Sequence, residues 1–444
     1  MREQIGTRGA RWTRARVLSG GAVLAGGAVA AACAAPGAPP AAAPSAREVT
    51  ISYVTDWSGG ARGEWVKAAV PRFTAENPKI QVRVDNWGGE VTVVATANAA
   101  AGTLQDVMLG SNDIFIQLVR AGGMQDIAPV LRTLKVSMDD LISVPSTILY
   151  GGKQYGLPFQ FGPIAMVLNK TLFRNAGAEL PDERTTYPQL VDALRKVARP
   201  AENVYGFLSA AAFTVWLPFV WGWGGDRWTP DLKRSTIGDP AAVEGLQFYV
   251  DLMHRSHVAT PIDAAGKTPQ GVSFAAGNVA VAASTAPGKG MDREIAGKFE
   301  WDVMYHLIAP KTGKRNVFIN DQANTVTATA AKNGVFEQAV RFVAWCSASK
   351  TAQDLVVEVG PNAMPVYKPV LNGPAYTAGP PAGQKIVPAQ ASAFRDPQIF
   401  IGWNDWRDDV VKALTPAFAN QVAVQEAARE AARVGDLVLA KIPR

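Results

Sequence analysis

Strand-like and helix-like patterns of apolar residues alternate along the first part of the chain. Strand patterning is found over residues 49–54 (VTISYV), 80–84 (IQVRV) and 106–110 (DVMLG). Helical patterning is found over 64–76, where Pro71 is expected to bend the helix, and over 114–123, which ends at a glycine pair. Strands that alternate with helices predict an α/β fold, in which a mostly parallel sheet carries helices on its faces.

The second part of the chain repeats this alternation and begins with the segment YGLPFQFGPIAMVLNKTLFRNAG, Tyr155 to Gly177. It holds an apolar strand over 164–168, after which Asn169 opens a short helix. Further helices are predicted over 187–199, 239–255 and 336–345, and further strands over 279–284 and 301–305. A chain of this length with 48% hydrophobic residues buries more than one core, so two lobes are expected.

The N-terminus has the composition of an export signal. Five arginines and one glutamate precede an uncharged apolar run over 17–32, which ends at Cys33. The run is too short for a transmembrane helix. We predict a signal peptide over 1–32, lipidation at Cys33, and a Pro/Ala-rich tether over 33–47 that holds the protein at the outer face of the bacterial membrane, or in the periplasm.

Two points about the N-terminus stay open. The AAAC sequence lacks the usual leucine of a lipobox, so Cys33 as an ordinary residue of a cleaved signal is the alternative to lipidation. The TRARVL sequence is similar to a twin-arginine signal, but Ala15 separates the two arginines, which leaves the general secretory route open.

The charge of the chain excludes one class of partner. The formal net charge is +6, but residues 1–32 contribute +4 of it, and the remainder shows no Lys/Arg cluster. A basic footprint for nucleic acid is therefore absent from the sequence.

The chain has two cysteines. If Cys33 is lipidated, Cys346 has no cysteine left to pair with and no disulfide forms.

Motifs for catalysis are also missing. The sequence has three histidines and no Gly-x-Ser-x-Gly elbow, and the Gly266–Thr268 fragment (GKT) lacks the context of a phosphate loop. We predict no catalytic residue, no metal and no cofactor, and hence no enzyme. A hydrolase with two carboxylates distant in sequence stays open, because sequence spacing does not reveal such a pair.

Tryptophans in polar, glycine-rich surroundings are the chain's main candidate chemistry. Trp57 follows the first strand, Trp221 and Trp223 lie in VWGWGG, and Trp403 lies in IGWNDW. An aromatic face that stacks on a sugar ring, beside side chains that bond its hydroxyls, forms a saccharide site. Tryptophans that fill core space are the alternative.

We place Trp221 and Trp223 at the mouth of a cleft, on one face of a strand, because Gly222, Gly224 and Gly225 argue against a stable helix. Asn112 and Asp113 are expected to face them from the first lobe, together with Trp57.

Several segments resemble extracellular solute-binding protein family 1, the maltose-binding-like receptor lipoproteins of ABC sugar importers. They are YGLPFQFGPIAMVLNKTLFRNAG, FTAENPKIQVRV, FAAGNVAVAAS and FVAWCSASKTAQDLV. The order of these segments along the chain makes the match specific. Leu168 and Thr171 depart from the family's usual Tyr and Asp, and INDQANTVTA replaces a glycine-bearing segment, which leaves the ligand class open.

The resemblance implies a type II periplasmic-binding-protein fold with a ligand cleft between two lobes. The first lobe would comprise 48–160 and 320–360, and the second 161–319 and 361–444. The chain would cross between lobes near Phe159, Gln160 and Phe161, which would line the cleft, and again near Asn320 and near residues 361–367. Asn320 and Asp321 would also bind the ligand.

The implied function is capture of a small solute, a sugar or oligosaccharide, by a monomer that closes on it and delivers it to an ABC permease. The alternatives are a lipid-anchored hydrolase, a surface adhesin or signalling partner, and a receptor for a non-sugar solute such as a glycerol-phosphate ester.

Overall fold

The computed structural model describes residues 48–86, 91–142, 148–285, 287–360, 363–396 and 398–442. Within these ranges it does not describe the side chains of Val91, Thr92, Ser111, Asn112, Asp113, Gln160 and Asp321. The predicted signal peptide, Cys33 and the tether lie outside the described residues.

Nine strands form one mixed sheet in the described part of the chain, in the order β2-β1-β3-β10-β6-β8-β7, with β11 beside β10 and β9 beside β6. The strands are β1 (Val49–Val54), β2 (Ile80–Asp85), β3 (Val107–Ser111), β6 (Gly156–Asn169), β7 (Tyr205–Phe207), β8 (Val279–Thr285), β9 (Trp301–Met304), β10 (Val317–Val326) and β11 (Phe394–Arg395). A separate hairpin joins β4 (Leu149–Tyr150) to β5 (Lys153–Gln154). The α/β class is confirmed.

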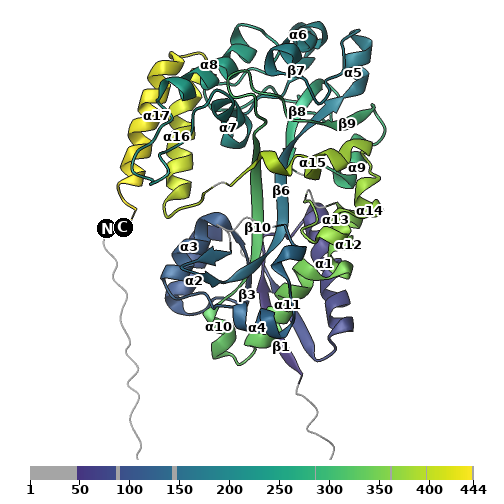
Figure 1. Cartoon of the computed structure of the whole chain (residues 1–444), viewed down its shortest axis with the longest axis vertical. Coiled ribbons are helices and arrows are strands. Elements are labelled where there is room, and N and C mark those ends of the chain that lie inside the picture. Colours follow the sequence, from purple (N-terminus) through teal and green to yellow (C-terminus); the bar gives the residue numbers. More distant parts are fainter. Residues whose placement is uncertain are drawn as a thin grey trace, which may run out of the picture. The chain divides into compact units, whose positions relative to one another are not determined.

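The sheet is less parallel than expected because two long strands run through both lobes. β1 pairs in parallel with β2 and β3, and β7 with β8, but β6 and β10 are antiparallel to each other. β10 is also antiparallel to β3, and β6 to β8 and β9. In Figure 1, β6 and β10 run upright from the lobe of β1–β3 into the lobe of β7–β9.

Each face of the sheet buries its own core, as the period-two alternation of a strand requires. Along β6, Ala165 and Val167 belong to the core cluster that also contains the first lobe's Ile51 and Phe73. Their neighbours Ile164, Met166 and Leu168 face the second lobe's main core instead.

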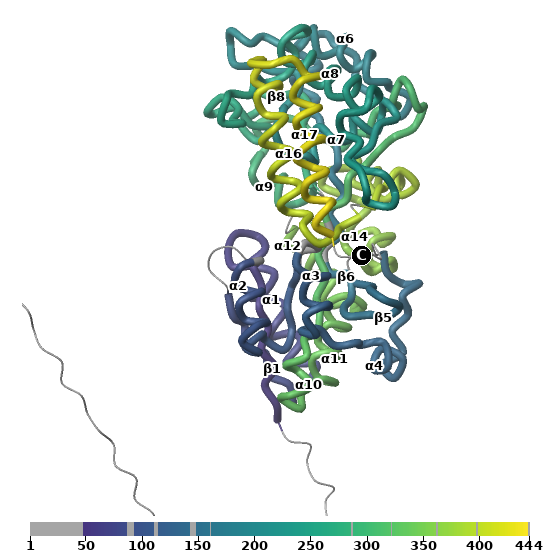
Figure 2. The backbone as a smooth tube through the Cα atoms, turned by 90° about the vertical axis from the view of Figure 1, so that its left-hand side faces the viewer, coloured from purple at the N-terminus to yellow at the C-terminus, as the bar shows by residue number. Residues whose placement is uncertain are grey.

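Helices cover the faces of both lobes (Figures 1 and 2). The first lobe carries α1 (Gly60–Glu76), α2 (Val91–Ala101), α3 (Asn112–Arg120), α4 (Ala128–Thr133), α10 (Ala328–Lys332), α11 (Phe336–Ala348) and α12 (Lys350–Val359). The second carries α5 (Lys170–Asn175), α6 (Tyr187–Val197), α7 (Phe213–Gly222), α8 (Pro240–His254), α9 (Lys289–Ile295), α16 (Trp403–Phe418) and α17 (Val424–Leu439). Three short helices lie between α12 and α16 along the chain: α13 (Lys368–Leu371), α14 (Pro374–Thr377) and α15 (Ile386–Ala389).

Local sequence explains where several elements begin. The Asn169 side chain accepts a hydrogen bond from the Leu172 N–H at 3.1 Å and so caps α5, as the sequence indicated. Pro240 stands in the first turn of α8, where its missing N–H costs no helical hydrogen bond. The helix predicted over 64–76 is also present within α1, with Trp65, Ala69 and Phe73 in the core.

The segment VWGWGG is helical, so our prediction that its glycines exclude a helix is wrong. α7 runs through Trp221 to Gly222, and Trp223 is its C-cap. Gly224 has a φ of +87°, the left-handed conformation with which helices commonly end. The glycines therefore end the helix and do not prevent it, and Trp221 and Trp223 do not share the face of a strand.

Residues 363–371 hydrogen-bond to the first lobe. The Ile142 N–H donates to the Val366 carbonyl at 2.8 Å, and the Val366 N–H donates to Gln353 Oε1 at 2.7 Å. The Lys368 ammonium donates to the Asp139 carbonyl at 2.6 Å. The resemblance places the chain from 361 onward in the second lobe, whereas these contacts support a first lobe that extends through Leu371.

Candidate functional site

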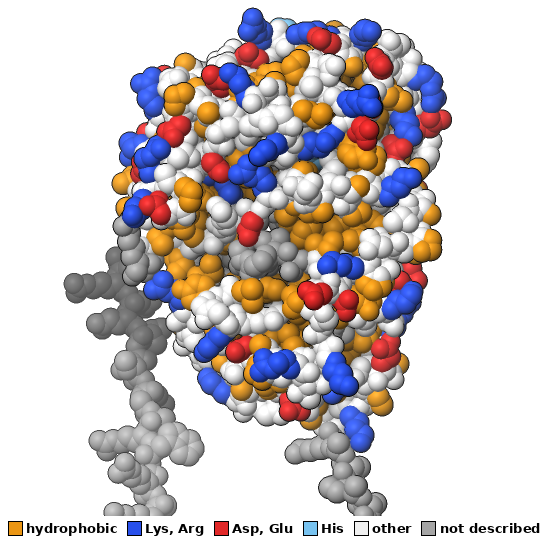
Figure 3. Space-filling model, viewed as in Figure 1, with side chains coloured by type: hydrophobic (Ala, Val, Ile, Leu, Met, Phe, Trp, Pro, Cys, Tyr) orange, Lys and Arg blue, Asp and Glu red, His pale blue; other side chains and the backbone are white. Residues whose placement is uncertain are grey.

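A hollow of about 770 Å³ lies between elements of the two lobes. Its lining comes from the start of α1 in the first lobe, from α9 in the second lobe and from the end of α12; the residues are Gly59, Gly60, Ala61, Arg62, Glu64, Gly290, Arg293, Glu294, Val359 and Gly360. This volume is within the range of small-molecule sites. On the face shown in Figure 3, apolar side chains gather at mid-height, with charged side chains below them.

A glycine-rich turn shapes the first-lobe side of the hollow. β1 ends at Val54, and the Trp57 N–H then donates to Thr55 Oγ1 at 3.0 Å, which tightens the turn before α1. Gly60 has a φ of +56°. A Cβ atom on Gly63 would lie 2.9 Å from the Ser58 carbonyl, so this close approach needs glycine. The sequence SGGARG thereby brings Arg62 to the hollow.

Arg62 lies over one of the predicted sugar-stacking tryptophans. Its guanidinium carbon is 5.3 Å from the centroid of the Trp57 ring. Trp57 itself is only 2% exposed, and it packs against Phe159 with ring centroids 4.9 Å apart. Its indole N–H donates to Gln322 Oε1 on β10 at 3.2 Å. Burial lowers the pKa of the Arg62 guanidinium, and the Asp56 carboxylate partly opposes this shift.

Arg293 enters the hollow from the second lobe. One of its Nη2–H groups donates to the Val359 carbonyl at the end of α12. Beside it, Gly360 has a φ of +62°, and a Cβ atom on Gly360 would lie 2.7 Å from the Gly290 nitrogen. Glycine at position 360 therefore allows α9 to approach the end of α12.

The second lobe repeats the arrangement of arginine over tryptophan. Trp221 is 1% exposed, and its indole N–H donates to Asp226 Oδ1 at 2.9 Å. Its ring is stacked on that of Phe318, with a centroid distance of 6.1 Å and an interplanar angle of 10°. The Arg395 guanidinium carbon is 4.5 Å from the Trp221 ring centroid, and Arg395 also bonds Asp226 Oδ2 at 3.1 Å.

A second arginine lies deeper in this cluster. Arg227 is buried, with its guanidinium carbon 4.1 Å from the Trp228 ring centroid. Burial lowers its pKa to about 10, while the neighbouring Asp226 carboxylate acts in the opposite direction. This arginine packs the core and does not face solvent.

The structure buries most of the aromatic side chains among the predicted ligand residues. Phe161 packs against Phe394, and Trp403 packs against Trp228 and Trp406. Trp223 is half-buried against Tyr187 and Phe248. The buried set is Trp57, Phe159, Phe161, Trp221 and Trp403.

Of the predicted polar ligand residues, the structure describes the side chain of Asn320 alone. Asn320 is exposed on β10, opposite Gly162 of β6. The side chains of Asn112, Asp113, Gln160 and Asp321 lie outside the description. Contact between any of these predicted residues and a ligand stays a prediction. Sequence reasoning missed Arg62 and Arg293; the glycine pair before Arg62 was the available signal.

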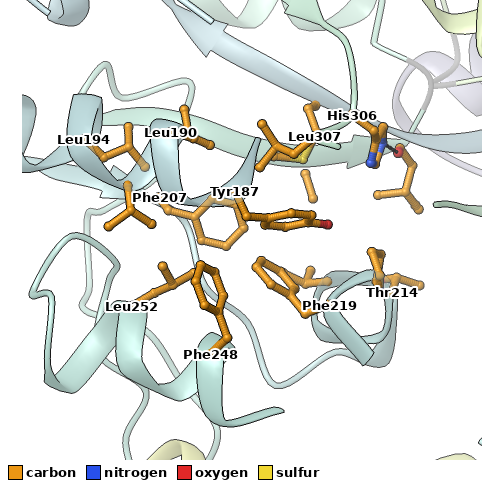
Figure 4. A pocket seen from close by; sticks show the side chains of 16 residues that line it. Tyr187, Leu190, Leu194, Phe207, Thr214, Phe219, Phe248, Leu252, His306 and Leu307 are labelled. Atoms are coloured by element: carbon orange, nitrogen blue, oxygen red, sulfur yellow. Dashed lines mark hydrogen bonds between the residues drawn. The ribbon is translucent and has the colours of Figure 1, made fainter. Parts of the chain in front are cut away.

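An apolar pocket lies apart from this hollow, in the core of the second lobe (Figure 4). Its volume is about 30 Å³, and its lining includes Tyr187, Phe219, Phe248 and His306. A space of this size with apolar walls is a packing gap and not a solute site.

His306 is the imidazole labelled in Figure 4 beside the aromatic side chains. Its Nε2 lies 2.6 Å from the Ile164 carbonyl oxygen, which only accepts, so Nε2 carries the proton. Burial lowers the pKa of this imidazole to about 4.

Two further features bear on the class of the protein. Within the described ranges, no three His, Cys, Asp or Glu side chains come together in a way that suits a metal ion. Nor does any described helix combine the length and apolar character needed to cross a membrane.

Solved structures with the same fold come from several bacteria. An ABC substrate-binding protein of Listeria monocytogenes, in complex with cycloalternan, has a TM-score of 0.76 at 22% identity, covering 88% of this chain and 97% of that one. UgpB of Mycobacterium tuberculosis, in complex with glycerophosphocholine, has a TM-score of 0.74 at 15% identity, with coverages of 88% and 99%. The GacH receptor of Streptomyces glaucescens, solved unliganded and with acarbose, has a TM-score of 0.72 at 20% identity, with coverages of 89% and 99%. At these identities the likeness shows the fold, which is the expected type II periplasmic-binding-protein fold.

Comparison with curated proteins gives no match. The family model described as "bacterial extracellular solute-binding protein" matches residues 57–353, which is more than half of the chain. Members of this family are binding proteins that work outside the cytoplasm, as its description states. The chain is a member of the bacterial extracellular solute-binding protein family.

Proposed function

We propose that the protein captures a small solute between its lobes by hinge closure and delivers it to the permease of an ABC importer. The hollow lined by both α1 and α9 carries this proposal, because a ligand held there touches both lobes at once. Only β6 and β10 run through both lobes as long strands among the described elements, and a few residues at such crossings absorb a hinge motion.

The class of solute is proposed from chains of the same fold. Cycloalternan and acarbose are carbohydrates, and glycerophosphocholine is a phosphodiester. We propose a sugar or oligosaccharide as the solute, with a glycerol-phosphate ester as the alternative. The protein acts as a receptor and makes or breaks no bond.

Most of the predicted aromatic residues lie beneath the surface in this structure, so in this proposal they form the floor of the site. Phe159 and Phe161 lie on β6 where it leaves the first lobe, and Asn320 lies on the neighbouring strand with an exposed side chain. Trp57 and Trp221 lie beneath Arg62 and Arg395, so these arginines have to move before either ring stacks on a sugar.

A thermal-shift screen against a panel of carbohydrates tests the proposal. A solute that binds only the folded state raises its stability, by about 2.7 kcal/mol at a hundredfold excess over the dissociation constant. If no member of the panel stabilises the protein, capture of a carbohydrate is excluded at these concentrations. Product formation from an oligosaccharide would instead support the hydrolase.

We also propose that Cys33 anchors the protein by lipid to the outer face of the bacterial membrane. The small residues before Cys33 and the Pro/Ala-rich segment after it support this assignment. Intact-mass analysis of the protein from its membrane fraction is expected to show an acylated chain that begins at Cys33. A soluble, unmodified chain that begins elsewhere would contradict lipidation.

A further inference from the structure

The hollow between α1 and α9 contains two arginines from different lobes, Arg62 and Arg293. Two glutamates are also in the lining. Glu64 lies 3.9 Å from the Lys67 ammonium on the exposed side of α1, so a lysine outside the hollow partly offsets its charge. Glu294 adds a second carboxylate on α9. The hollow therefore offers both cationic donors and anionic acceptors to a solute.

The two guanidinium groups lack a close anionic partner. Among the described residues, no hydrogen bond or ion pair is formed by Arg62, and Asp56 affects it only at longer range. Arg293 is exposed and donates to the neutral Val359 carbonyl, and it forms no ion pair with a carboxylate among the described residues. The Arg62 guanidinium is partly withdrawn from water without a counter-ion, which costs free energy that a bound anion would recover.

The Trp57 ring fixes where Arg62 lies. The indole is buried and held by Gln322 and Phe159, so its face is a rigid support under the guanidinium. Stacking on an aromatic face leaves the N–H groups at the edge of the guanidinium free to donate, and this planar edge matches the two oxygens of a carboxylate or phosphate.

We infer that the solute carries an anionic group, a phosphate ester or a carboxylate, which Arg62 and Arg293 bind from the two lobes. This inference rests on the proposed capture function and narrows its solute class. Glu64 and Glu294 then accept hydrogen bonds from hydroxyl groups on the same solute. Sugar phosphates, sugar acids and glycerol-phosphate esters combine both kinds of group.

Matched pairs of solutes test the inference on the full-length chain. Thermal shift and calorimetry are carried out with glucose against glucose 6-phosphate and glucuronate, glycerol against glycerol 3-phosphate, and maltotriose as a neutral oligosaccharide. We expect at least one acid to bind and its neutral counterpart to bind about tenfold more weakly or not at all. The two acids derived from glucose separate phosphate from carboxylate recognition.

Neutral solutes separate the inference from the proposed function. If maltotriose or glucose binds as tightly as every acid, the anionic solute class is wrong while solute capture stands. If none of these solutes binds, the result counts against solute capture, and the inference fails with it.

Variants of the two arginines give the second test. With an acid that binds, Arg62→Gln and Arg293→Gln are each expected to weaken affinity about 10- to 100-fold, the usual effect of losing a charge-assisted hydrogen bond. The controls are Arg72→Gln on α1 and Lys298→Gln after α9, since both residues lie outside the hollow. Unchanged affinity in both arginine variants, with melting temperatures equal to that of the unmodified protein, overturns the assignment.

Discussion

The guanidinium of Arg395 lies over the face of the Trp221 indole, with its central carbon 4.5 Å from the ring centroid. Asp226 holds this pair together, because one carboxylate oxygen accepts from the Trp221 N–H at 2.9 Å and the other from Arg395 at 3.1 Å. Phe318 is stacked on the Trp221 ring as well. The ring is thus a structural part of the second lobe before any solute arrives.

Replacing Trp221 by alanine is therefore expected to destabilise the unliganded protein. Removal of a fully buried large aromatic side chain costs about 3–5 kcal/mol, and here Asp226 also loses a hydrogen-bond donor. Denaturant unfolding of the unliganded variant measures the loss.

Trp223→Ala is the matched comparison, because Trp223 lies two residues further along and is only half-buried. Its loss of stability is expected to be smaller. Unchanged stability in Trp221→Ala, combined with lost affinity for a solute, would contradict the core role and favour the sugar platform that we proposed from the sequence.

Much of the fold was predictable because it depends on local patterns. Strand and helix periods identified α1, β2, β3, α6 and α8, and Asn169 marked the start of α5. The course of the chain after residue 360 was not predictable, since it depends on hydrogen bonds between Val366, Ile142 and Gln353, which are distant in sequence.

The candidate site was less predictable than the fold. Glycine-rich surroundings suggested that Trp57 and Trp221 were exposed, yet tertiary packing buries both rings. Arg62 and Arg293 are far apart in the sequence and belong to no motif. Their presence in the same hollow depends on the packing of α1 and α9, which the sequence does not reveal.

The buried His306 is expected to make the protein less stable in mild acid. Its folded-state pKa is about 4, whereas an unfolded histidine has a pKa of about 6.5. Between these two values the unfolded state binds the proton and the folded state does not, so stability falls as the pH is lowered through this window. The loss between pH 7 and pH 5 is on the order of 2 kcal/mol for this group.

Unfolding titrations of His306→Gln at both pH values measure this contribution, because glutamine donates a hydrogen bond without titrating. The difference in stability between pH 7 and pH 5 is expected to shrink relative to the unmodified protein. His257→Gln, which replaces an exposed histidine, is the control. An unchanged difference in His306→Gln would show that His306 does not dominate the acid response.

Gly360 is expected to be sensitive to substitution because α9 approaches it closely. Gly360→Ala places a Cβ atom 2.7 Å from the Gly290 nitrogen, and its backbone has a φ of +62°. The left-handed backbone costs alanine about 1–2 kcal/mol, and the clash adds about 1–3 kcal/mol. Denaturant unfolding measures the sum.

Gly334→Ala isolates the backbone contribution. Gly334 has a φ of +69°, and a Cβ atom there meets no other atom within 4 Å. This variant is expected to lose only the backbone part. Equal losses in the two variants would mean that α9 gives way freely, and that the end of α12 does not define the edge of the hollow.

The proposed capture mechanism predicts that the two lobes close on a bound solute. The β6–β10 ladder joins the lobes, and its register shifts between Gln322 and Ala323, next to the pairing of Asp321 with Phe161. A shift of this kind bends and twists a strand pair, so it is a suitable point for a hinge.

Solution scattering of the protein with a solute identified by thermal shift is expected to show a smaller radius of gyration than scattering of the protein without that solute. A panel member that gives no thermal shift is the control and should leave the profile unchanged. If the profiles with and without a bound solute superimpose, the solute binds without closure and hinge capture is the wrong mechanism.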